Sequence, residues 1–429
     1  MKTPYPFQQF AIDYMTSHNT YLCDDCGLGK TLTSIEAVKA AGNEHKKVLV
    51  VCLKSAKLQW REAILEQVPD ATVIMTEHLP YDFKNLDAWF ITTYDELVPN
   101  IILYPVARIV WNSIILDEAH KIRNATTQRS KNVTKLMGAQ KIALSATPIE
   151  RHGGQLWPVL KWLDREAFPS YWVWIKRTFE NKKGYFGGWN IGDPLDLIEY
   201  QAQVMPYVIR RLKEQVAPEL PPKIESFVPI LMAPEQEAEY NMLYESIDAL
   251  VAIEDKQLLI TNALTLFTRL HQIASWPGLL GLKAGSSKIE WLLDFLDNNP
   301  NLNVLVFSKY REMVNHVHNC TGAFRVIGGL DESHQFIKGE GRILAGTIDG
   351  MSESLNLGMA DAVVFLDQHW STTKMKQAVD RVHRIDIISP KLIYYLNSAD
   401  VDTQVMDAVT NKLSEQNMLL NFVRRANVS

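Results

Sequence analysis

The amino-acid sequence predicts an α/β protein built from two parallel-sheet lobes, with helical insertions between them. Short apolar runs alternate with helical patterns, first in the amino-terminal third of the 429-residue chain and again in its last third. Their hydrophobicity is continuous rather than alternating, which is typical of strands buried on both faces of a parallel sheet. The first series comprises residues 47–53, 88–94, 112–118 and 141–147, and the second comprises 304–308, 324–327, 342–347, 362–367 and 391–396.

The segment between the two series has a different character. Residues 150–285 hold helical patterns rich in Trp, Tyr and Arg, and "ELPPK" at 219–223 is typical of a stiff linker. We expect the first strand of the second lobe near residues 224–230. The predicted domains are a first lobe at 1–165, a helical insertion and linker at 166–221, and a second lobe at 222–429 with its own helical insertion at about 234–285.

Composition and charge restrict the class of protein. Hydrophobic residues make up 47% of the chain, enough for a large core, and no run of about 18 apolar residues predicts a transmembrane helix. The first residues lack the apolar run of a signal peptide, and the four cysteines fit free thiols in a reducing compartment, so we expect a cytoplasmic protein. Because the formal net charge is −5, any nucleic-acid partner must be bound by local basic patches.

The stretch "YLCDDCGLGKTLTS", from Tyr21 to Ser34, predicts a phosphate-binding turn. We expect a strand that ends at Cys23, a glycine-rich turn, and a helix from about Lys30, so that backbone N–H groups face one anion. Lys30 would reach the β- and γ-phosphates of ATP, and the Thr31 hydroxyl would bind Mg²⁺. A chance glycine-rich helix start is the alternative, because Asp24 stands where the strict pattern has its first glycine.

The same stretch contains a C-x-x-C pair, Cys23 and Cys26, which has the spacing of a zinc or redox site. A zinc ion would need two more ligands, and Cys52 and Cys320 offer no second pair of this kind. Metal at Cys26 would also compete with the anion that the turn holds. We therefore expect ATP and Mg²⁺ as cofactors, and no zinc.

Two adjacent carboxylates, Asp117 and Glu118, follow an apolar run in "IILDEAH". At the end of a buried strand such a pair is costly unless it binds something. Asp117 is placed to hold Mg²⁺, and Glu118 is placed to polarise the water that attacks the γ-phosphate. An isolated Asp-Glu pair is usually a solvated turn, but a pair downstream of Gly-Lys-Thr predicts an ATPase.

Two arginines in "QAVDRVHRID" are candidates for transition-state stabilisation. Arg381 and Arg384 are three residues apart and so share one helix face. A planar guanidinium binds phosphate oxygens bidentately and stays charged. A salt-bridged surface helix is the alternative; in a two-lobe protein the arginines would act as fingers entering from the second lobe.

Taken in order, these motifs resemble a known family. The chain contains "PFQQFAIDYM", "DDCGLGKT", "CLKSAKLQW", "ITTYDEL", "LDEAHKIRN", "LSATPIERHGGQLW", "RRLKEQVAPELPPK", "RLHQIASWPGLL", "VLVFSKY", "GTIDGMSESLNLGMADAVVFLD" and "QAVDRVHRID". This series is similar to superfamily 2 helicase-like ATPases of the SNF2 family, and residues 179–213 look most like their annealing-helicase, fork-remodelling branch. The resemblance implies two RecA-like lobes and matches the acidic pair that commonly precedes the turn in this family.

The resemblance also implies site residues. Gln8, with Gln9 as its rival, would recognise adenine, and Gln377 would lie at the nucleotide between the lobes. The nucleotide would be bound by Asp25, Cys26, Gly27, Leu28, Gly29, Lys30 and Thr31. His120, Ser145 and Thr147 would couple the nucleotide state to the grip on DNA.

A motor that tracks a phosphate backbone should contact DNA through small polar groups at strand ends. The candidates are Lys54, Ser55, Thr92, Thr93, Ser308, Thr347 and Asn356, and an ordinary loop residue is an equal alternative for each. For Trp60 we expect a core position rather than base stacking. The insertion could form a nucleic-acid surface or pack its aromatic residues on the first lobe; its residues of interest are Tyr171, Trp172, Trp174, Lys176, Arg177, Lys182, Lys183, Tyr185 and Trp189.

Three departures from the family pattern affect expected details. Only Gly350 is present where two adjacent glycines are usual, "HRID" replaces "HRIGQ", and "SATP" replaces "TGTP". None removes a catalytic group. The predicted function is an ATP-dependent translocase on duplex or branched DNA, working as a monomeric motor of compact bacterial or phage type. The alternatives are a strand-separating DNA or RNA helicase and an ATP-gated nucleic-acid clamp with little turnover.

Overall fold

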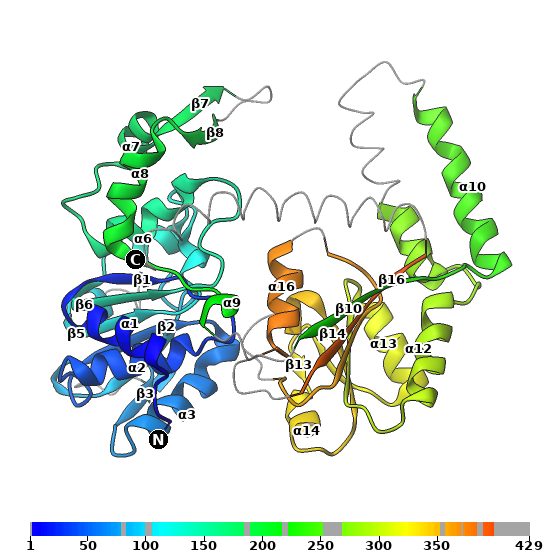
Figure 1. Cartoon of the computed structure of the whole chain (residues 1–429), viewed down its shortest axis with the longest axis horizontal. Helices are drawn as coiled ribbons and strands as arrows, with labels where there is room; N and C mark the ends of the chain where they lie inside the picture. The colour runs from blue at the N-terminus through cyan, green and yellow to red at the C-terminus, as the bar shows by residue number, and fades with distance from the viewer. Residues whose placement is uncertain are drawn as a thin grey trace. The chain divides into compact units, whose positions relative to one another are not determined.

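The computed structural model divides into two compact units, which Figure 1 colours by residue number. The described part of the first unit ends at Val216, and that of the second begins at Pro222. The structure describes residues 2–78, 83–98, 105–183, 189–216, 222–251, 268–351, 357–369, 372–383 and 389–398. Asn356, Arg384 and Tyr185, which the sequence singled out, lie outside these ranges.

The first unit contains a seven-stranded sheet whose strands all run parallel, in the order β3-β4-β2-β5-β6-β1-β9. The four apolar runs of the first series form β2, β4, β5 and β6, which confirms that prediction. The bounds are β1 Thr20–Leu22, β2 Val48–Cys52, β3 Val73–Met75, β4 Trp89–Thr93, β5 Val110–Leu116, β6 Met137–Leu144 and β9 Val208–Ile209.

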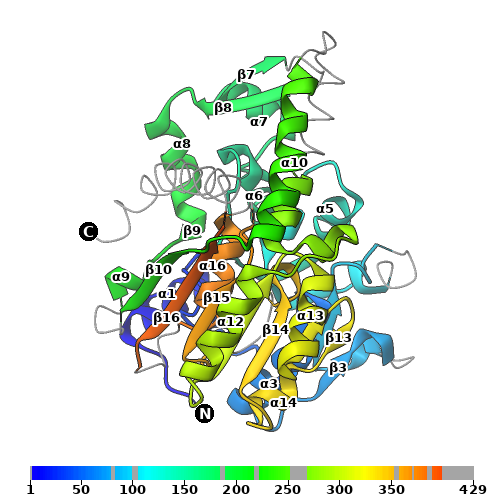
Figure 2. The ribbon, with the colours of Figure 1, turned by 90° about the vertical axis from the view of Figure 1, so that its right-hand side faces the viewer.

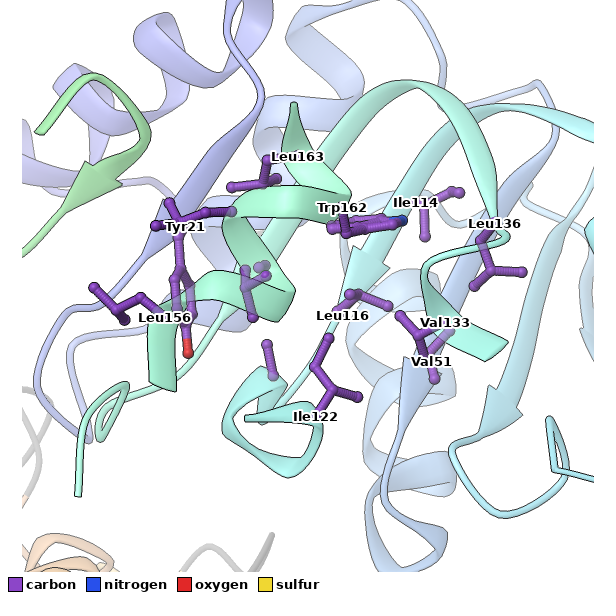
Figure 3. Close-up of a cluster of buried hydrophobic side chains, with 14 of the residues drawn as sticks. Tyr21, Val51, Ile114, Leu116, Ile122, Val133, Leu136, Leu156, Trp162 and Leu163 are labelled. Carbon is purple, nitrogen blue, oxygen red and sulfur yellow. The ribbon is translucent and has the colours of Figure 1, made fainter. Parts of the chain in front are cut away.

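Helices cover both faces of this sheet, because its strands are apolar on both sides. In β2, Val48 and Val50 belong to one core cluster, which includes side chains of α1, α2 and α3, while Leu49 and Val51 belong to the other. Figure 3 shows part of this other cluster, which includes Val51, Leu116 and Trp162 of α6. The helix bounds are α1 Pro6–Ser17, α2 Lys30–Ala40, α3 Lys57–Gln67, α5 Gln128–Val133 and α6 Trp157–Leu163.

The insertion that follows α6 is not purely helical, which corrects the prediction for residues 166–221. Between α7 and α8 the chain forms an antiparallel hairpin of β7 and β8. After α8 it returns to the first sheet as β9, beside β1, so the first unit extends beyond residue 165. The bounds are α7 Tyr171–Thr178, β7 Phe179–Lys183, β8 Trp189–Pro194, α8 Leu197–Val204 and α9 Lys213–Val216.

The second unit contains another seven-stranded sheet, in the order β10-β16-β15-β11-β14-β12-β13, and only β12 and β13 pair antiparallel. All five apolar runs of the second series are strands, and β10 confirms the expected first strand. The bounds are β10 Lys223–Pro229, β11 Val304–Ser308, β12 Phe324–Ile327, β13 Leu330–Asp331, β14 Ile343–Thr347, β15 Ala362–Phe365 and β16 Lys391–Asn397.

Helices again lie on both faces of this second sheet. Figure 2 shows α12 and α13 in front of the strands, where their side chains share a core with Val304 and Val306. Leu305 and Phe307 face the opposite core, which includes residues of α16. Residues 268–275 are also helical, and the other bounds are α10 Pro234–Val251, α12 Ser287–Asn298, α13 Arg311–Thr321, α14 Ser333–Ile337, α15 Ile348–Met351 and α16 Thr372–Asp380.

Within the described ranges, no helix combines the length and apolar character needed to cross a membrane.

The contrast between the exposed first residue of β5 and its buried last residue gives a test of the first core. Leu116→Ala should lower the free energy of unfolding by about 2–5 kcal/mol, because it leaves a cavity among tightly packed side chains. Val110→Ala, on the same strand but at a position 67% exposed, should change it by no more than about 0.5 kcal/mol. Urea unfolding followed by tryptophan fluorescence measures both, and equal effects would contradict the proposed core.

Candidate active site

The phosphate-binding turn lies between β1 and α2, as the sequence predicts. Backbone pairing continues beyond β1, since Cys23 N–H donates to the Ile209 carbonyl at 2.6 Å. Gly27 and Gly29 then adopt left-handed φ values of 79° and 74°. A Cβ atom on Gly29 would lie 2.4 Å from Nε2 of Gln8, so both the backbone conformation and the packing require glycine there.

The helix α2 begins directly after this turn. Its N-cap residue is Gly29, so no side chain caps the first N–H groups of the helix. The first N–H groups of a helix have no partner inside it, so they are suited to an anion. Lys30 Nζ donates to the carbonyls of Asp24 at 2.8 Å and Asp25 at 3.1 Å. The ammonium group therefore lies over the turn itself, and Thr31, beside it, is half-buried.

Gln8 and Gln9 have different environments. The Gln8 amide donates to the Leu28 carbonyl at 2.9 Å and accepts from Tyr5 N–H at 2.8 Å, and its side chain is buried. Gln9 is exposed and donates to Asp13. Of the two, Gln8 contacts the turn; its role in adenine recognition stays a prediction.

Asp117 and Glu118 follow β5, at the same sheet edge as the turn, because the strands are parallel. The two Asp117 oxygens accept from Glu118 N–H at 3.0 Å and from the indole N–H of Trp60 at 2.8 Å. Tyr94 O–H donates to the Asp117 carbonyl at 2.7 Å, and burial raises the pKa of this tyrosine, as does the nearby Asp117 charge. Trp60 is therefore a core residue, as the sequence predicts, and it also holds the Asp117 carboxylate, which the sequence did not predict.

Glu118 is in a strained conformation that directs it toward the expected coupling residues. It is a non-glycine residue with positive φ, 49°, an arrangement associated with functional sites. Its Oε2 lies 3.1 Å from His120 Nδ1, and the same nitrogen lies 3.1 Å from Ser145 Oγ. Ser145 Oγ also accepts from Thr147 N–H at 3.1 Å. The structure therefore links Glu118 to all three residues for which coupling was predicted.

The acidic pair that precedes the turn is bound by two arginines from the segment after β9. Asp24 is fully buried and accepts from the Nε and backbone N–H of Arg211, each at 3.0 Å, and from its Nη2. Asp25 lies 3.5 Å from Arg210, which also donates to the carbonyls of Cys23 and Ala146. Burial raises the pKa of Asp24, and the Arg211 guanidinium opposes this change. In the sequence, "RRLK" served only as a motif typical of the family, and its contact with the acidic pair was not predicted.

The cysteines at the turn are buried and unbridged. Cys23, Cys26 and Cys52 lie inside the first unit, whereas Cys320 is exposed. Burial raises the pKa of the Cys23 thiol and of the Cys52 thiol, which favours the neutral form over the thiolate that binds metals.

Of the residues assigned to the second lobe, Gln377 lies in α16 and Arg381 directly follows this helix, whereas Arg384 lies outside the described residues. Gln377 is buried, and Arg381 N–H donates to its carbonyl at 3.2 Å. Arg381 is half-buried. The role of Arg381 and Arg384 as fingers stays a prediction.

The candidate DNA contacts differ in accessibility. Lys54 and Ser55 are exposed in a short 3₁₀ turn after β2. Thr92 is buried and donates to Glu96, whose pKa is lowered, because hydrogen bonds from Lys57 and Thr76 outweigh the effect of its burial.

Thr93, Ser308 and Thr347 are also buried, and Asn356 lies outside the described residues. Thr93 accepts from Glu96 N–H at 3.1 Å, and Thr347 accepts from Gly350 N–H at 3.1 Å. Ser308 is 1% exposed and donates to the buried Asp367, so its hydroxyl is not on the surface as a DNA contact requires. Only Lys54 and Ser55 are therefore fully accessible among the described candidates.

The buried pair of Asp24 and Arg211 gives a stability test. Arg211→Met alone should cost about 3–5 kcal/mol, because it leaves a buried carboxylate without its partner. The double variant with Asp24→Asn should cost less than the sum of the single variants by at least about 1 kcal/mol. The exposed pair of Asp95 and Arg129 is a matched control, with an expected coupling below about 1 kcal/mol. Urea unfolding of the two cycles checks this, and equal couplings would refute it.

Comparison with known proteins identifies the family. The SNF2-related domain matches residues 7–279, and the helicase conserved C-terminal domain matches residues 287–386. The putative ATP-dependent helicase/translocase YwqA of Bacillus subtilis is 26% identical, over 89% of this chain and 44% of its own length. Mouse ZRANB3, named a DNA annealing helicase and endonuclease, is 26% identical over 96% of this chain and 40% of its own.

This chain therefore spans less than half the length of these curated relatives. A solved structure, the SWI2/SNF2 ATPase core of Sulfolobus solfataricus in complex with dsDNA, aligns with all of this chain and 95% of its own, at 23% identity and a TM-score of 0.46. Because the SNF2-related domain covers more than half of the sequence and a helicase C-terminal domain follows it, the chain belongs to the SNF2-related family of helicase-like proteins.

Proposed function

We propose that this chain is a DNA-dependent ATPase that translocates on double-stranded DNA and uses this motion for branch migration, fork remodelling or annealing. One observation carries the proposal: a glycine turn with Lys30 and a helix start shares a sheet edge with Asp117 and Glu118. The names of the bacterial and mouse relatives support the same activity.

Each site residue of the first unit has a distinct role in this proposal. The turn N–H groups and Lys30 bind the phosphates of ATP, and the Gln8 side chain, fixed against Leu28, is near enough to the turn to sense the base. Thr31 and Asp117 offer the hard oxygen ligands that Mg²⁺ prefers. When bound there, the ion would neutralise charge on the phosphates.

Glu118 is the proposed general base for the attacking water. Its contact with His120, and through His120 with Ser145, gives a short route from the γ-phosphate to the loop after β6. A change at the phosphate would thus alter a polar chain that ends at Thr147. We propose that Arg381 and Arg384, with Gln377 nearby, complete the site from the second unit.

The DNA backbone is proposed to lie along the exposed Lys54 and Ser55, beside the strand ends. Thr92 and Thr93, held by Glu96, shape the neighbouring loop. We further propose that the chain acts as a monomeric motor in the cytoplasm of a bacterium or of a phage-infected host, which the bacterial relative supports.

Lys30→Ala and Glu118→Gln should each reduce DNA-stimulated ATP hydrolysis by about 100-fold or more, because they remove a phosphate contact and the general base. Lys46→Ala and Glu62→Gln change exposed residues of the same types and should keep the wild-type rate. A phosphate-release assay with and without duplex DNA, at fixed salt, measures all four variants.

Equal turnover of the wild type with and without DNA would exclude the proposed function. Displacement of a third strand from a triplex, without unwinding of a duplex, supports translocation. Duplex unwinding would favour the strand-separating helicase, and nucleotide-dependent DNA affinity with negligible hydrolysis would favour the clamp.

Trp60→Phe removes one hydrogen bond to Asp117 while keeping an aromatic side chain in the core. Loss of such an outer partner commonly weakens metal affinity by about 10–100-fold. We therefore expect weaker Mn²⁺ binding in the presence of a non-hydrolysable ATP analogue, measured by electron paramagnetic resonance. Trp111→Phe is the control, because Trp111 is equally buried but donates to the Val106 carbonyl. If the two variants bind Mn²⁺ alike, Trp60 does not position the carboxylate.

A further inference from the structure

The hairpin of β7 and β8, together with α7, exposes two tryptophans that the ATPase proposal does not use. Trp172 is 42% exposed and Trp189 is 46% exposed, although large aromatic side chains are usually buried. Their ring centroids are 6.0 Å apart. In Figure 1 the hairpin lies beyond α7 and α8, away from the first sheet.

Two lysines share the faces that carry these rings. Lys176 comes four residues after Trp172 on α7, so both project from the same side of the helix. Lys183 is directly opposite Trp189 in the hairpin register, so both project from the same face of the two-stranded sheet. We call Trp172, Lys176, Lys183 and Trp189 the hairpin surface.

The neighbouring aromatic residues pack inward and support this surface. Trp174, Phe179 and Tyr200 are buried in the first core, with ring centroids 5.2–6.3 Å apart. The packing alternative from the sequence therefore holds for part of the insertion, and the nucleic-acid alternative stays a prediction for the exposed part. Trp174 packs on the first unit, whereas Trp172 and Trp189 remain accessible.

The charge around the hairpin surface is positive, although the whole chain has a net charge of −5. Lys176, Arg177, Lys182 and Lys183 are all exposed. Within the described residues, none of the four has a carboxylate at ion-pair distance. The exposed acids between α7 and the end of β8 are Glu180 and Asp193, so cations predominate.

We propose that the hairpin surface binds an unpaired nucleic-acid strand, which makes it the element that distinguishes branched DNA from plain duplex. Unpaired bases stack on exposed aromatic rings, and nearby lysines neutralise the phosphates between them. Inside a duplex the base faces are covered by their neighbours, so only a single strand, a fork or a junction can offer them to tryptophan. This inference rests on the proposed DNA-dependent function for its role, but the binding itself can be measured separately.

The test compares three sets of substitutions by fluorescence anisotropy at two salt concentrations. The ligands are labelled oligo(dT), a blunt duplex, and the same duplex with a forked end. Trp172→Ala with Trp189→Ala removes the rings, and Lys176→Gln with Lys183→Gln removes two charges. The control is Leu195→Ala with Ile198→Ala, which removes exposed apolar side chains of the same insertion that are not part of the hairpin surface.

Removing the rings should raise the dissociation constant for oligo(dT) and for the fork about tenfold or more, and leave the blunt duplex unchanged. Removing the two lysines should lower the salt slope for oligo(dT) by about 1.4. The control pair should bind like the wild type. If the variant without the two tryptophan rings has a lower melting temperature, the variant without the two lysines serves as an independent test.

Unchanged binding of oligo(dT) and fork in both sets would overturn the proposal and leave a protein partner as the occupant. An equal loss for blunt duplex and fork would also overturn it, because the surface would then be a general phosphate contact. If DNA does not stimulate ATP hydrolysis by the wild type, the proposed function fails. Binding of oligo(dT) would still show whether the hairpin surface binds an unpaired strand.

Discussion

All strands of the first sheet run parallel, and this constraint brings distant segments of the chain to one edge. The phosphate turn follows β1, Asp117 and Glu118 follow β5, and Ser145 follows β6, which lies between them. Lys54 follows β2 in the same direction. Residues separated by more than a hundred positions in sequence therefore meet without any special loop, because parallel strands place their carboxyl ends together.

The turn at the end of β1 depends on a second contact, with the arginines that follow β9. Asp24, which stands where the strict phosphate-loop pattern has its first glycine, is bound by Arg211, and Asp25 is bound by Arg210. Asp25 N–H also donates to the Arg211 carbonyl at 3.0 Å. The same segment continues into α9, where the described part of the first unit ends. A nucleotide that shifts the turn would therefore act on a buried ion pair at the end of the first unit.

Local patterns were enough to predict most of the strands and the turn, because continuous apolar runs and glycine spacing are properties of neighbouring residues; the short β3 and β13 were not predicted. Two-residue β9 has no such pattern, and its place beside β1 depends on pairing across about 190 residues. The contacts of Arg211 with Asp24 and of Trp60 with Asp117 also join residues that are far apart in the sequence, by 187 and 57 positions. The hairpin was predicted as helix, because apolar and polar residues alternate only weakly along its two strands. Even the apolar Trp189 is exposed, opposite the exposed Lys183.

The central claim is that ATP binds between the turn at residues 25–31 and the carboxylates after β5. It is tested most directly by a crystal structure of the chain with a non-hydrolysable ATP analogue and Mg²⁺. We expect the triphosphate against the backbone N–H groups of the turn and Lys30, with the metal beside Thr31 and Asp117. A triphosphate bound elsewhere, or a turn closed by Lys30 against Asp24 and Asp25 at saturating analogue, would contradict it.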